Sequence, residues 1–319
     1  MIVLKFGGTS LESAEAIQRM ESIVQSRLSR HPVVVVSALG KVTDNLLALG
    51  TEAAAGCRQQ ELERFVWMKD YHSRIASTLI RRQDQQDLDQ FLESHFCQLQ
   101  ALLDRLEESG EFTPEAQDAV SSFGERFSSR IVTMALRKSG METIHFDSRV
   151  LIRTDKQHTQ ATPLLKETYA NVRRALASVD MGVVPVFGGF IGSTSTGVTT
   201  TLGRSSSNLT AVLLAAALRA EEVEIWTDVD GVFLHDPRQV CDQFPLEELS
   251  FEDALEIAHR GARVLHLGAI LLAQQENIPL WIRNSRRPEV PGTRIVSHAS
   301  VLRAARIEGY VGQRAVSSD

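Results

Sequence analysis

The sequence predicts an α/β protein, a three-layer sandwich in which a mainly parallel sheet is covered by helices on both faces and carries a helical insertion. Strand-like apolar runs alternate with helical patterns along the whole 319-residue chain, which is typical of parallel sheets. Residues 33–36 are four consecutive valines, as expected for a strand buried on both faces. Near the middle of the chain, a glycine- and hydroxyl-rich segment joins a strand to a helix, a common place for ligand binding in such folds.

The first unit of the chain is a strand, a glycine turn and a helix. Residues 2–6 form an apolar strand that contains Lys5, and apolar residues recur at helical spacing over residues 14–24. The turn between them is Gly7-Gly8-Thr9-Ser10. Because open α/β sheets bind ligands at the carboxyl ends of their strands, we expect this turn to face a phosphate. Lys5 alone is equally compatible with a solvated edge residue.

A second strand and a long helical insertion follow. The valine run ends in a polar loop at residues 37–44, after which another helix begins. From about residue 56 to residue 138 the chain is rich in Glu, Gln, Arg and Leu and has few glycines, so we predict a helical insertion there. Pro114 suits the first turn of a new helix within it.

The second half continues the alternation of strands and helices. We expect strands at residues 142–146, 183–187, 222–226 and 279–283, and helices at residues 209–218, 251–260 and 267–275. The long connection after residue 187 is rich in Gly, Ser and Thr. Its glycines allow the backbone to approach a ligand closely, and it leads into a helix N-terminus, which favours a phosphate or carboxylate. A mobile, solvated loop is the alternative.

Composition and charge exclude several classes of function. A net charge of -6 and a pI near 5.9 provide no general attraction to nucleic acid or to an anionic membrane, so we expect neither as a partner. The three cysteines are widely separated, which favours a reducing compartment over a disulfide framework or a zinc site. The chain shows no signal-peptide pattern and no apolar window near the length of a membrane span. We therefore expect a cytoplasmic protein.

Six motifs occur in one order along the chain. They are Lys5-Phe6-Gly7-Gly8-Thr9-Ser10, the loop from Val36 to Asp44, Ser122-Phe123-Gly124-Glu125, Thr200-Thr201-Leu202-Gly203-Arg204, Trp226-Thr227-Asp228-Val229-Asp230-Gly231 with Asp236-Pro237-Arg238, and Leu249-Ser250-Phe251 through His266. In these motifs the chain resembles the catalytic domain of aspartokinases, in the amino acid kinase superfamily. The resemblance covers nearly the whole chain.

The resemblance implies a fold, a division into lobes and an activity. An amino-terminal lobe, residues 1–180 with the insertion at about 56–138, would hold the amino acid, and a carboxyl-terminal lobe, residues 181–319, would hold ATP. The implied reaction is ATP-dependent phosphorylation of the side-chain carboxylate of L-aspartate or a close analogue. Mg²⁺ would lie on the phosphates of ATP, and no protein side chain is assigned to the metal.

Matching the motifs position by position implies the roles of individual residues. Lys5 would stabilise charge on the transferring phosphoryl group, beside the position that Asn208 occupies. Glu125 would bind the ammonium group of the substrate and Arg204 its α-carboxylate, which Arg can grip with two parallel hydrogen bonds. Thr43 and Ser207 would line the same pocket. The remaining implied contacts are to the phosphates and the nucleotide, from Gly7, Gly8, Thr9, Thr227, Asp228, Phe233 and Arg263. Alternatively, Glu125 and Arg204 could pair with each other or with helix ends.

The chain departs from the family pattern in one loop. The family normally has Gly-Arg-Gly-Gly-Ser-Asp, whereas this chain has Gly203-Arg204-Ser205-Ser206-Ser207-Asn208. An aspartate side chain with a pKa of about 4 is already ionised and needs no general base, so an asparagine that orients Lys5 could leave activity in place. A serine where the backbone needs a positive φ would add strain of the order of 1 kcal/mol.

Two functions therefore remain open. One is a working kinase; the other is a catalytically impaired homologue that binds an amino acid or nucleotide as a sensor or partner subunit. Retention of Lys5, Glu125, Arg204 and Asp228 favours the kinase. A kinase for an N-acylated amino acid would leave Glu125 without an ammonium partner, and a dinucleotide-dependent oxidoreductase would need a GxGxxG spacing that the first turn lacks.

The carboxyl-terminal end leads to two further expectations. After Ile295 the residues suffice only for a final element and a tail, so we expect no regulatory ACT domains and no feedback inhibition by lysine or threonine. A homodimer is compatible with the apolar helix faces. His259 and His266 could belong to its interface, and ordinary structural roles for both are the alternative.

Overall fold

A central sheet organises the molecule, in a computed structural model that describes residues 1–81, 83–233, 245–259 and 266–297. Within these residues the sheet has eight strands in the order β3-β4-β2-β1-β7-β9-β10-β8. Their bounds are β1 Ile2–Phe6, β2 Pro32–Val36, β3 Thr143–Phe146, β4 Val184–Gly188, β7 Val223–Thr227, β8 Glu248–Ser250, β9 Leu280–Asn284 and β10 Thr293–Val296. The strands predicted at residues 142–146, 183–187, 222–226 and 279–283 are confirmed to within one residue at either end.

The sheet is mainly parallel, as predicted. β1 pairs in parallel with β2 and β7, and β4 lies in parallel between β2 and β3. The exception is the pairing of β10 with β9, which is antiparallel, and β8, which runs parallel to β10, is reversed with it. Since β1, β2, β4 and β7 are parallel neighbours, their carboxyl ends meet at one edge, where α/β proteins bind ligands.

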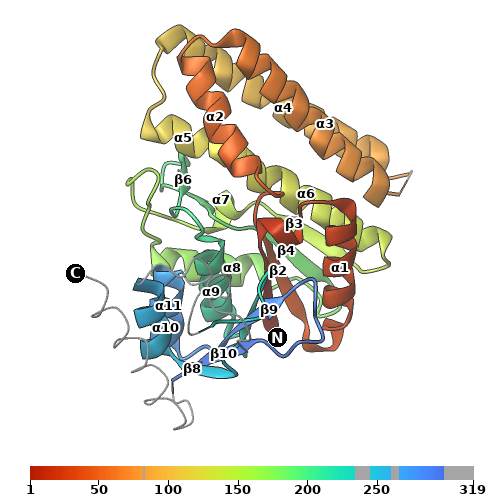
Figure 1. Ribbon diagram of the computed structural model, residues 1–319, viewed down its shortest axis with the longest axis vertical. Coiled ribbons are helices and arrows are strands. Elements are labelled where there is room, and N and C mark those ends of the chain that lie inside the picture. The colour runs from red at the N-terminus through yellow and green to blue at the C-terminus, as the bar shows by residue number, and fades with distance from the viewer. Residues whose placement is uncertain (82, 234–244, 260–265, 298–319) are drawn as a thin grey trace, which may run out of the picture.

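Helices cover both faces of the sheet (Figure 1). On one face α1 (Ala14–Gln25) and α6 (Phe123–Lys138) pack in one core with Ile2 and Leu4 of β1. On the other face the core contains Val3 together with the apolar residues of α8 (Leu165–Leu176), α9 (Ser207–Leu218), α10 (Phe251–His259) and α11 (Leu267–Glu276). The alternation of side chains along β1 thus divides the interior into two cores and makes the three-layer sandwich.

The predicted insertion is helical, and part of it belongs to the sandwich. α2 (Val42–Ala54), α3 (Arg58–Leu79) and α4 (Gln85–Ser109) form long helices that extend away from the sheet, with α5 (Pro114–Ser121) at their base (Figure 1). Pro114 opens α5, as expected. α6 lies within residues 56–138, but it packs on β3 and β4 as a layer of the sandwich. The division of the chain into two lobes at about residue 180 stays a prediction.

The connection predicted after residue 187 is more ordered than a glycine-rich loop. β5 (Ile191–Ser193) and β6 (Thr199–Thr201) form an antiparallel hairpin in which Ile191 is paired with Thr201. The sequence prediction missed this hairpin because each strand has only three residues, too few for alternation to be recognised. The short elements α7 (Ser148–Leu151) and η1 (Gly8–Ser10) complete the region.

None of the helices in the described ranges combines the length and apolarity that crossing a membrane requires.

Candidate active site

The carboxyl-terminal edge of the sheet brings together two buried ionisable side chains, a lysine and a glutamate. Lys5 lies on β1, on the same face as Val3 and therefore on the side of α9, and is 8% exposed. Glu125 lies in the first turn of α6 and is 3% exposed. Asn208, also buried, lies in the first turn of α9. The edge therefore collects the lysine, the carboxylate and the amide that the motifs single out.

Burial shifts the pKa values of both charged groups. It raises the pKa of Glu125 to about 8, against the opposing effects of the Ala38 N–H and the Lys5 charge. It lowers the pKa of Lys5 to about 8, against the opposing effect of Glu125. Removing a group from water disfavours its charged form. An opposite charge nearby stabilises the charged form and so offsets part of the pKa shift. The two groups therefore titrate in the same pH range.

One oxygen of Glu125 remains available for a ligand. Its Oε1 accepts a hydrogen bond from the N–H of Ala38 at 3.0 Å. Its Oε2 is buried, and no described residue donates a hydrogen bond to it. A buried carboxylate oxygen without a donor is costly, and an ammonium group would remove this cost.

Two glycines at the end of β4 make room for protein, not for a ligand. A Cβ on Gly188 would lie 3.0 Å from the Cβ of Glu125, and a Cβ on Gly189 would lie 2.5 Å from the Cβ of Ser207. The expectation that glycines here let the backbone approach a ligand is therefore wrong for this pair. They let α6 and α9 approach the end of β4 from opposite faces, which places Glu125 and Ser207 on either side of it.

Ser207 ties α9 to the neighbouring strand. Its Oγ accepts a hydrogen bond from the Oγ of Ser37 at 3.0 Å, just beyond β2. Ser37 leads into the loop that carries Ala38, so one short segment contacts both Glu125 and Ser207. The polar loop predicted at residues 37–44 thus borders the candidate site.

Arg204 lies at the surface, apart from buried Glu125. Its side chain is 76% exposed, and its Nη2 is 2.9 Å from Oδ1 of Asp44, in the first turn of α2. Thr43, beside Asp44, is half-buried. This conformation corresponds to the alternative in which Arg204 pairs with a helix end. The ammonium-binding and carboxylate-binding groups expected from the resemblance are not brought together in it.

The loop around Arg204 is strained by one of its serines. Ser205 has φ of 64°, in the left-handed region that favours glycine, and Gly203 has φ of 95°. The expected penalty for serine at a glycine position thus applies to Ser205, at about 1 kcal/mol. Ser206 has φ of -78°, and its buried Oγ has no hydrogen-bond partner among the described residues.

The first glycine turn packs tightly against its neighbours. The N–H of Gly7 donates to the carbonyl of Trp226 at 3.0 Å, so in this structure it is occupied. A Cβ on Gly8 would lie 2.7 Å from the carbonyl oxygen of Gly40, so only glycine fits there. Gly8 and Thr9 begin η1, and within the described ranges neither N–H has an acceptor. The expected role of these two amides as phosphate donors stays a prediction.

Residues at the ends of β7 and β9 lie beside this turn. Ser10 and Ser285 place their hydroxyl oxygens 2.7 Å apart, and Ser285 also donates to the carbonyl of Thr227 at 3.0 Å. Thr227 donates to Oδ1 of the exposed Asp228 at 3.2 Å.

The described chain contains no group of three or more His, Cys, Asp or Glu side chains that could hold a metal.

Three further residues with predicted roles lie in the carboxyl-terminal region. Phe233 is half-buried at the end of a described segment, whereas Arg263 lies outside the described residues. His266 caps α11, since its Nδ1 accepts a hydrogen bond from the N–H of Ala269 at 3.2 Å. His266 therefore acts as a helix cap, and a place for it in a dimer interface stays a prediction.

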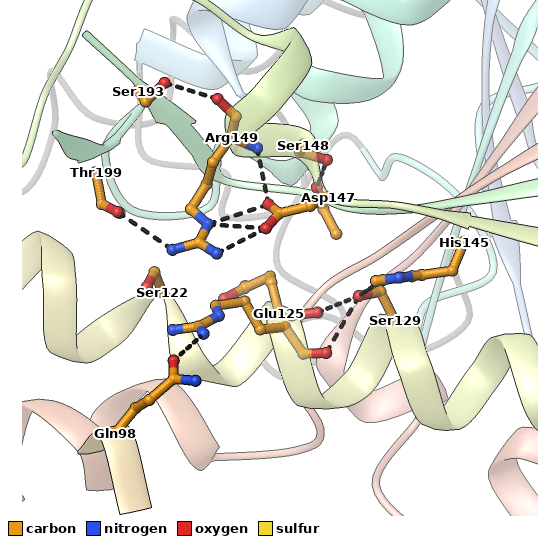
Figure 2. Close-up of polar contacts among 12 residues, drawn as sticks. Gln98, Ser122, Glu125, Ser129, His145, Asp147, Ser148, Arg149, Ser193 and Thr199 are labelled. Atoms are coloured by element: carbon orange, nitrogen blue, oxygen red, sulfur yellow. Dashed lines mark hydrogen bonds and ion pairs between the residues drawn. The ribbon is translucent and has the colours of Figure 1, made fainter. Parts of the chain in front are cut away.

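A polar layer behind Glu125 was not predicted from the sequence. Figure 2 shows Ser129 donating to the carbonyl of Glu125 at 2.6 Å, with the Nε2 of His145 at 2.9 Å from the same hydroxyl. Nearby, Arg149 binds the carboxylate of Asp147 through two nitrogens. Burial lowers the pKa of His145 to about 4, so this ring is neutral near pH 7. These residues belong to no motif, and only the helix spacing of Glu125 and Ser129 could have suggested a contact.

Comparisons with known proteins show which family the chain is similar to. The model of the amino acid kinase family matches residues 1–284. The chain is 35% identical to the chloroplastic aspartokinase 1 of Arabidopsis thaliana over 298 residues, 91% of this chain and 51% of that protein. It is 34% identical to a chloroplastic bifunctional aspartokinase/homoserine dehydrogenase 2 of Zea mays over 92% of this chain and 32% of that protein.

A solved structure of similar shape extends the comparison. The E. coli aspartokinase III in complex with aspartate and ADP, in its R-state, has a TM-score of 0.87 and 31% sequence identity. The alignment covers 94% of this chain and 65% of that one. The chain thus spans about half the length of the similar plant aspartokinases and about two thirds of the bacterial enzyme.

Proposed function

The chain belongs to the amino acid kinase family, and from this premise we propose that it transfers the γ-phosphoryl group of ATP to the side-chain carboxylate of L-aspartate or a close analogue. The observation that carries the proposal is Glu125, a buried carboxylate with one oxygen in need of a donor, close enough to Lys5 for the two charges to shift each other's pKa. An α-amino acid supplies the missing ammonium group. Similarity to aspartokinases supports aspartate as the acid.

Lys5 and the acceptor carboxylate carry the chemistry in this proposal. The substrate carboxylate, with a pKa of about 4, is ionised and attacks without a general base. Phosphoryl transfer depends mainly on positioning and on stabilising charge on the equatorial oxygens. A lysine ammonium at the carboxyl end of β1 can supply that charge, and Asn208 in the first turn of α9 can orient it.

Substrate recognition requires Arg204 to change partner. Glu125 binds the ammonium group, and Arg204 leaves Asp44 to bind the α-carboxylate. The Arg204–Asp44 pair is exposed, and exposed pairs are worth about 1 kcal/mol or less, so a substrate carboxylate can displace Asp44. Thr43 and Ser207 then border the bound amino acid.

The nucleotide is proposed to bind at the ends of β1 and β7. The N–H groups of Gly8 and Thr9 contact phosphate oxygens, and Thr227, Asp228 and Phe233 border the nucleotide. Mg²⁺ prefers oxygen ligands and commonly binds through phosphates and one or two carboxylates. Asp228 is an exposed carboxylate at this edge, so the residues present fit a magnesium ion bound to ATP, which would neutralise phosphate charge.

A second function is favoured by a specific observation. Ser205 adopts a left-handed conformation, and Asn208 replaces the aspartate usual in the family. An impaired homologue that binds an amino acid or nucleotide, as a sensor or as a partner subunit, would tolerate such a loop.

Hydroxylamine trapping distinguishes the two functions. Purified protein with Mg-ATP and L-aspartate is expected to form aspartyl hydroxamate, Lys5→Ala to abolish it, and Asn208→Asp to form it faster. Absence of product with the natural sequence, together with aspartate or ATP binding in calorimetry, would establish the sensor or partner function instead. Analytical ultracentrifugation of the same samples tests the expected homodimer.

A further inference from the structure

Asp118 is a buried carboxylate that the proposed chemistry does not use. It lies on α5 and is fully buried. Its two oxygens accept hydrogen bonds from the N–H of Thr159 at 3.0 Å each, from Nδ1 of His158 at 2.8 Å and from Oγ1 of Thr201 at 2.5 Å. Burying a carboxylate is costly unless such bonds compensate it, so these contacts tie α5 to two other segments, residues 158–159 and the end of β6.

One of these contacts holds a strained residue next to the loop of Arg204. Thr159 has φ of 69°, a conformation unfavourable for threonine, and its N–H bond to Asp118 helps to maintain it. Gly203 lies directly against this segment, since a Cβ there would be 3.7 Å from the carbonyl oxygen of Thr159 and 3.9 Å from Cγ of Gln160. Asp118 thus sets the surface on which Gly203 rests.

The second contact holds the strand that leads into the same loop. Thr201 ends β6, and its carbonyl accepts a hydrogen bond from the N–H of Ala161 at 2.9 Å. Its side chain is bound to Asp118. Asp118 therefore binds two residues close to Gly203. Thr201 precedes Gly203 by two positions in the sequence, and Thr159 contacts it in space.

We propose that Asp118 is a positioning residue for Arg204, and that it sets the affinity for the α-carboxylate of the amino acid through Thr201 and Thr159. The inference rests on the proposed function, because it assumes that Arg204 binds that carboxylate. Asp118 contacts neither substrate nor nucleotide in this account. Its effect is confined to the amino-acid side of the site, since the Gly8 and Asp228 region lies on other elements.

Steady-state kinetics on a small set of variants test the proposal. Asp118→Asn has the same shape but loses the negative charge and one of the two acceptor oxygens, so the bonds from Thr159 and Thr201 are no longer charge-assisted. We expect the KM for L-aspartate to rise roughly tenfold or more, as for the loss of a hydrogen bond to a charged group, with the KM for Mg-ATP unchanged. Thr201→Val should give the same pattern and Thr201→Ser should restore the natural value.

A matched control lies one residue away on β6. Thr200 is equally buried, and its Oγ1 is 2.7 Å from Oγ1 of Thr154, not bound to Asp118. Thr200→Val should therefore leave the KM for aspartate unchanged. A parallel rise of both KM values in Asp118→Asn, or an unchanged KM for aspartate in Thr201→Val, would overturn the proposal.

Failure of the proposed function gives a different result. If the natural protein neither phosphorylates nor binds aspartate, that function fails, and hydrogen–deuterium exchange of peptides over residues 201–206 decides the positioning role. Faster exchange in Asp118→Asn but not in Thr200→Val supports it. Equal exchange in the two variants refutes it.

Discussion

Replacing Glu125 by glutamine removes the charge that the proposed function requires while preserving a structural contact. The Oε1 of glutamine can still accept the N–H of Ala38, which is 3.0 Å from the present oxygen. The lost carboxylate should weaken aspartate binding about tenfold to a hundredfold, since hydrogen bonds to charged groups contribute about 1.5 to 3 kcal/mol. Calorimetric titration with L-aspartate measures this directly.

The same substitution should change the pH dependence of stability. The pKa of Glu125 rises from 4.5 in the unfolded chain to about 8 in the folded protein, so the folded state binds more protons between these values. Its contribution to stability is fully present below about pH 4.5 and is lost as the pH rises towards 8. Where the folded state binds one more proton than the unfolded chain, the free energy of unfolding falls by about 1.4 kcal/mol per pH unit. From about pH 5 to about pH 7 the free energy of unfolding therefore falls by about 2 to 3 kcal/mol.

Other groups titrate in or near this interval, so the difference between variants is the quantity to measure. Burial lowers the pKa of His72, His95 and His145 to about 4, which makes stability rise with pH up to about 6.5. Lys5, with its pKa lowered to about 8, binds fewer protons in the folded state only above about pH 7. Subtracting the curve of the natural protein from that of Glu125→Gln cancels the histidines and leaves Glu125 together with its effect on the pKa of Lys5.

Urea unfolding at several pH values, followed by circular dichroism, provides those curves. Glu61→Gln, at a buried glutamate on α3 remote from the sheet edge, is the control for the aspartate affinity and should retain it. If the difference between Glu125→Gln and the natural protein stays constant from pH 5 to 7, the buried-carboxylate argument is refuted. Unchanged aspartate affinity in Glu125→Gln would refute the ammonium-binding role.

Three further substitutions test the loop and the strand end. Ser205→Gly should raise the free energy of unfolding by about 1 kcal/mol by relieving its positive φ, whereas Ser205→Ala should not; equal urea midpoints would contradict this. Asp44→Asn frees Arg204 and should tighten aspartate binding by up to about fivefold, an effect that Asp44→Glu should lack in calorimetry. Gly189→Ala should cost about 1 to 3 kcal/mol through overpacking against Ser207, while Gly182→Ala, with open space around it, should unfold at nearly the natural temperature.

Much of the framework could be predicted from local sequence. The valine run of β2 and the apolar run of β1 are buried over their whole lengths, because a strand between two helical layers has no polar face. Lys5 is the one charged residue within β1, and its position near the strand end identified it as a candidate site residue. The motif around Glu125 identified the second charge, since its order among the other motifs is specific to one family.

The neighbours of these residues could not be predicted, because they come from distant parts of the chain. The room that Gly188 and Gly189 make is filled by Glu125 and Ser207, and a glycine in a sequence does not show what will occupy the space beside it. The partner of Arg204, Asp44, precedes it by 160 residues. Motif matching assigned Arg204 a role but could not show the conformation in which it rests.

The amino-acid sequence by itself determined the order of the longer strands and helices and the chemical groups at the sheet edge, since apolar periodicity and motif spacing are local properties. Only the tertiary structure decided the state of those groups. Burial sets the pKa values of Lys5 and Glu125 near 8, the left-handed backbone strains Ser205, and Asp118 connects α5 to Thr159 and Thr201. Each depends on solvent exclusion or on contacts across the fold, which no local pattern contains.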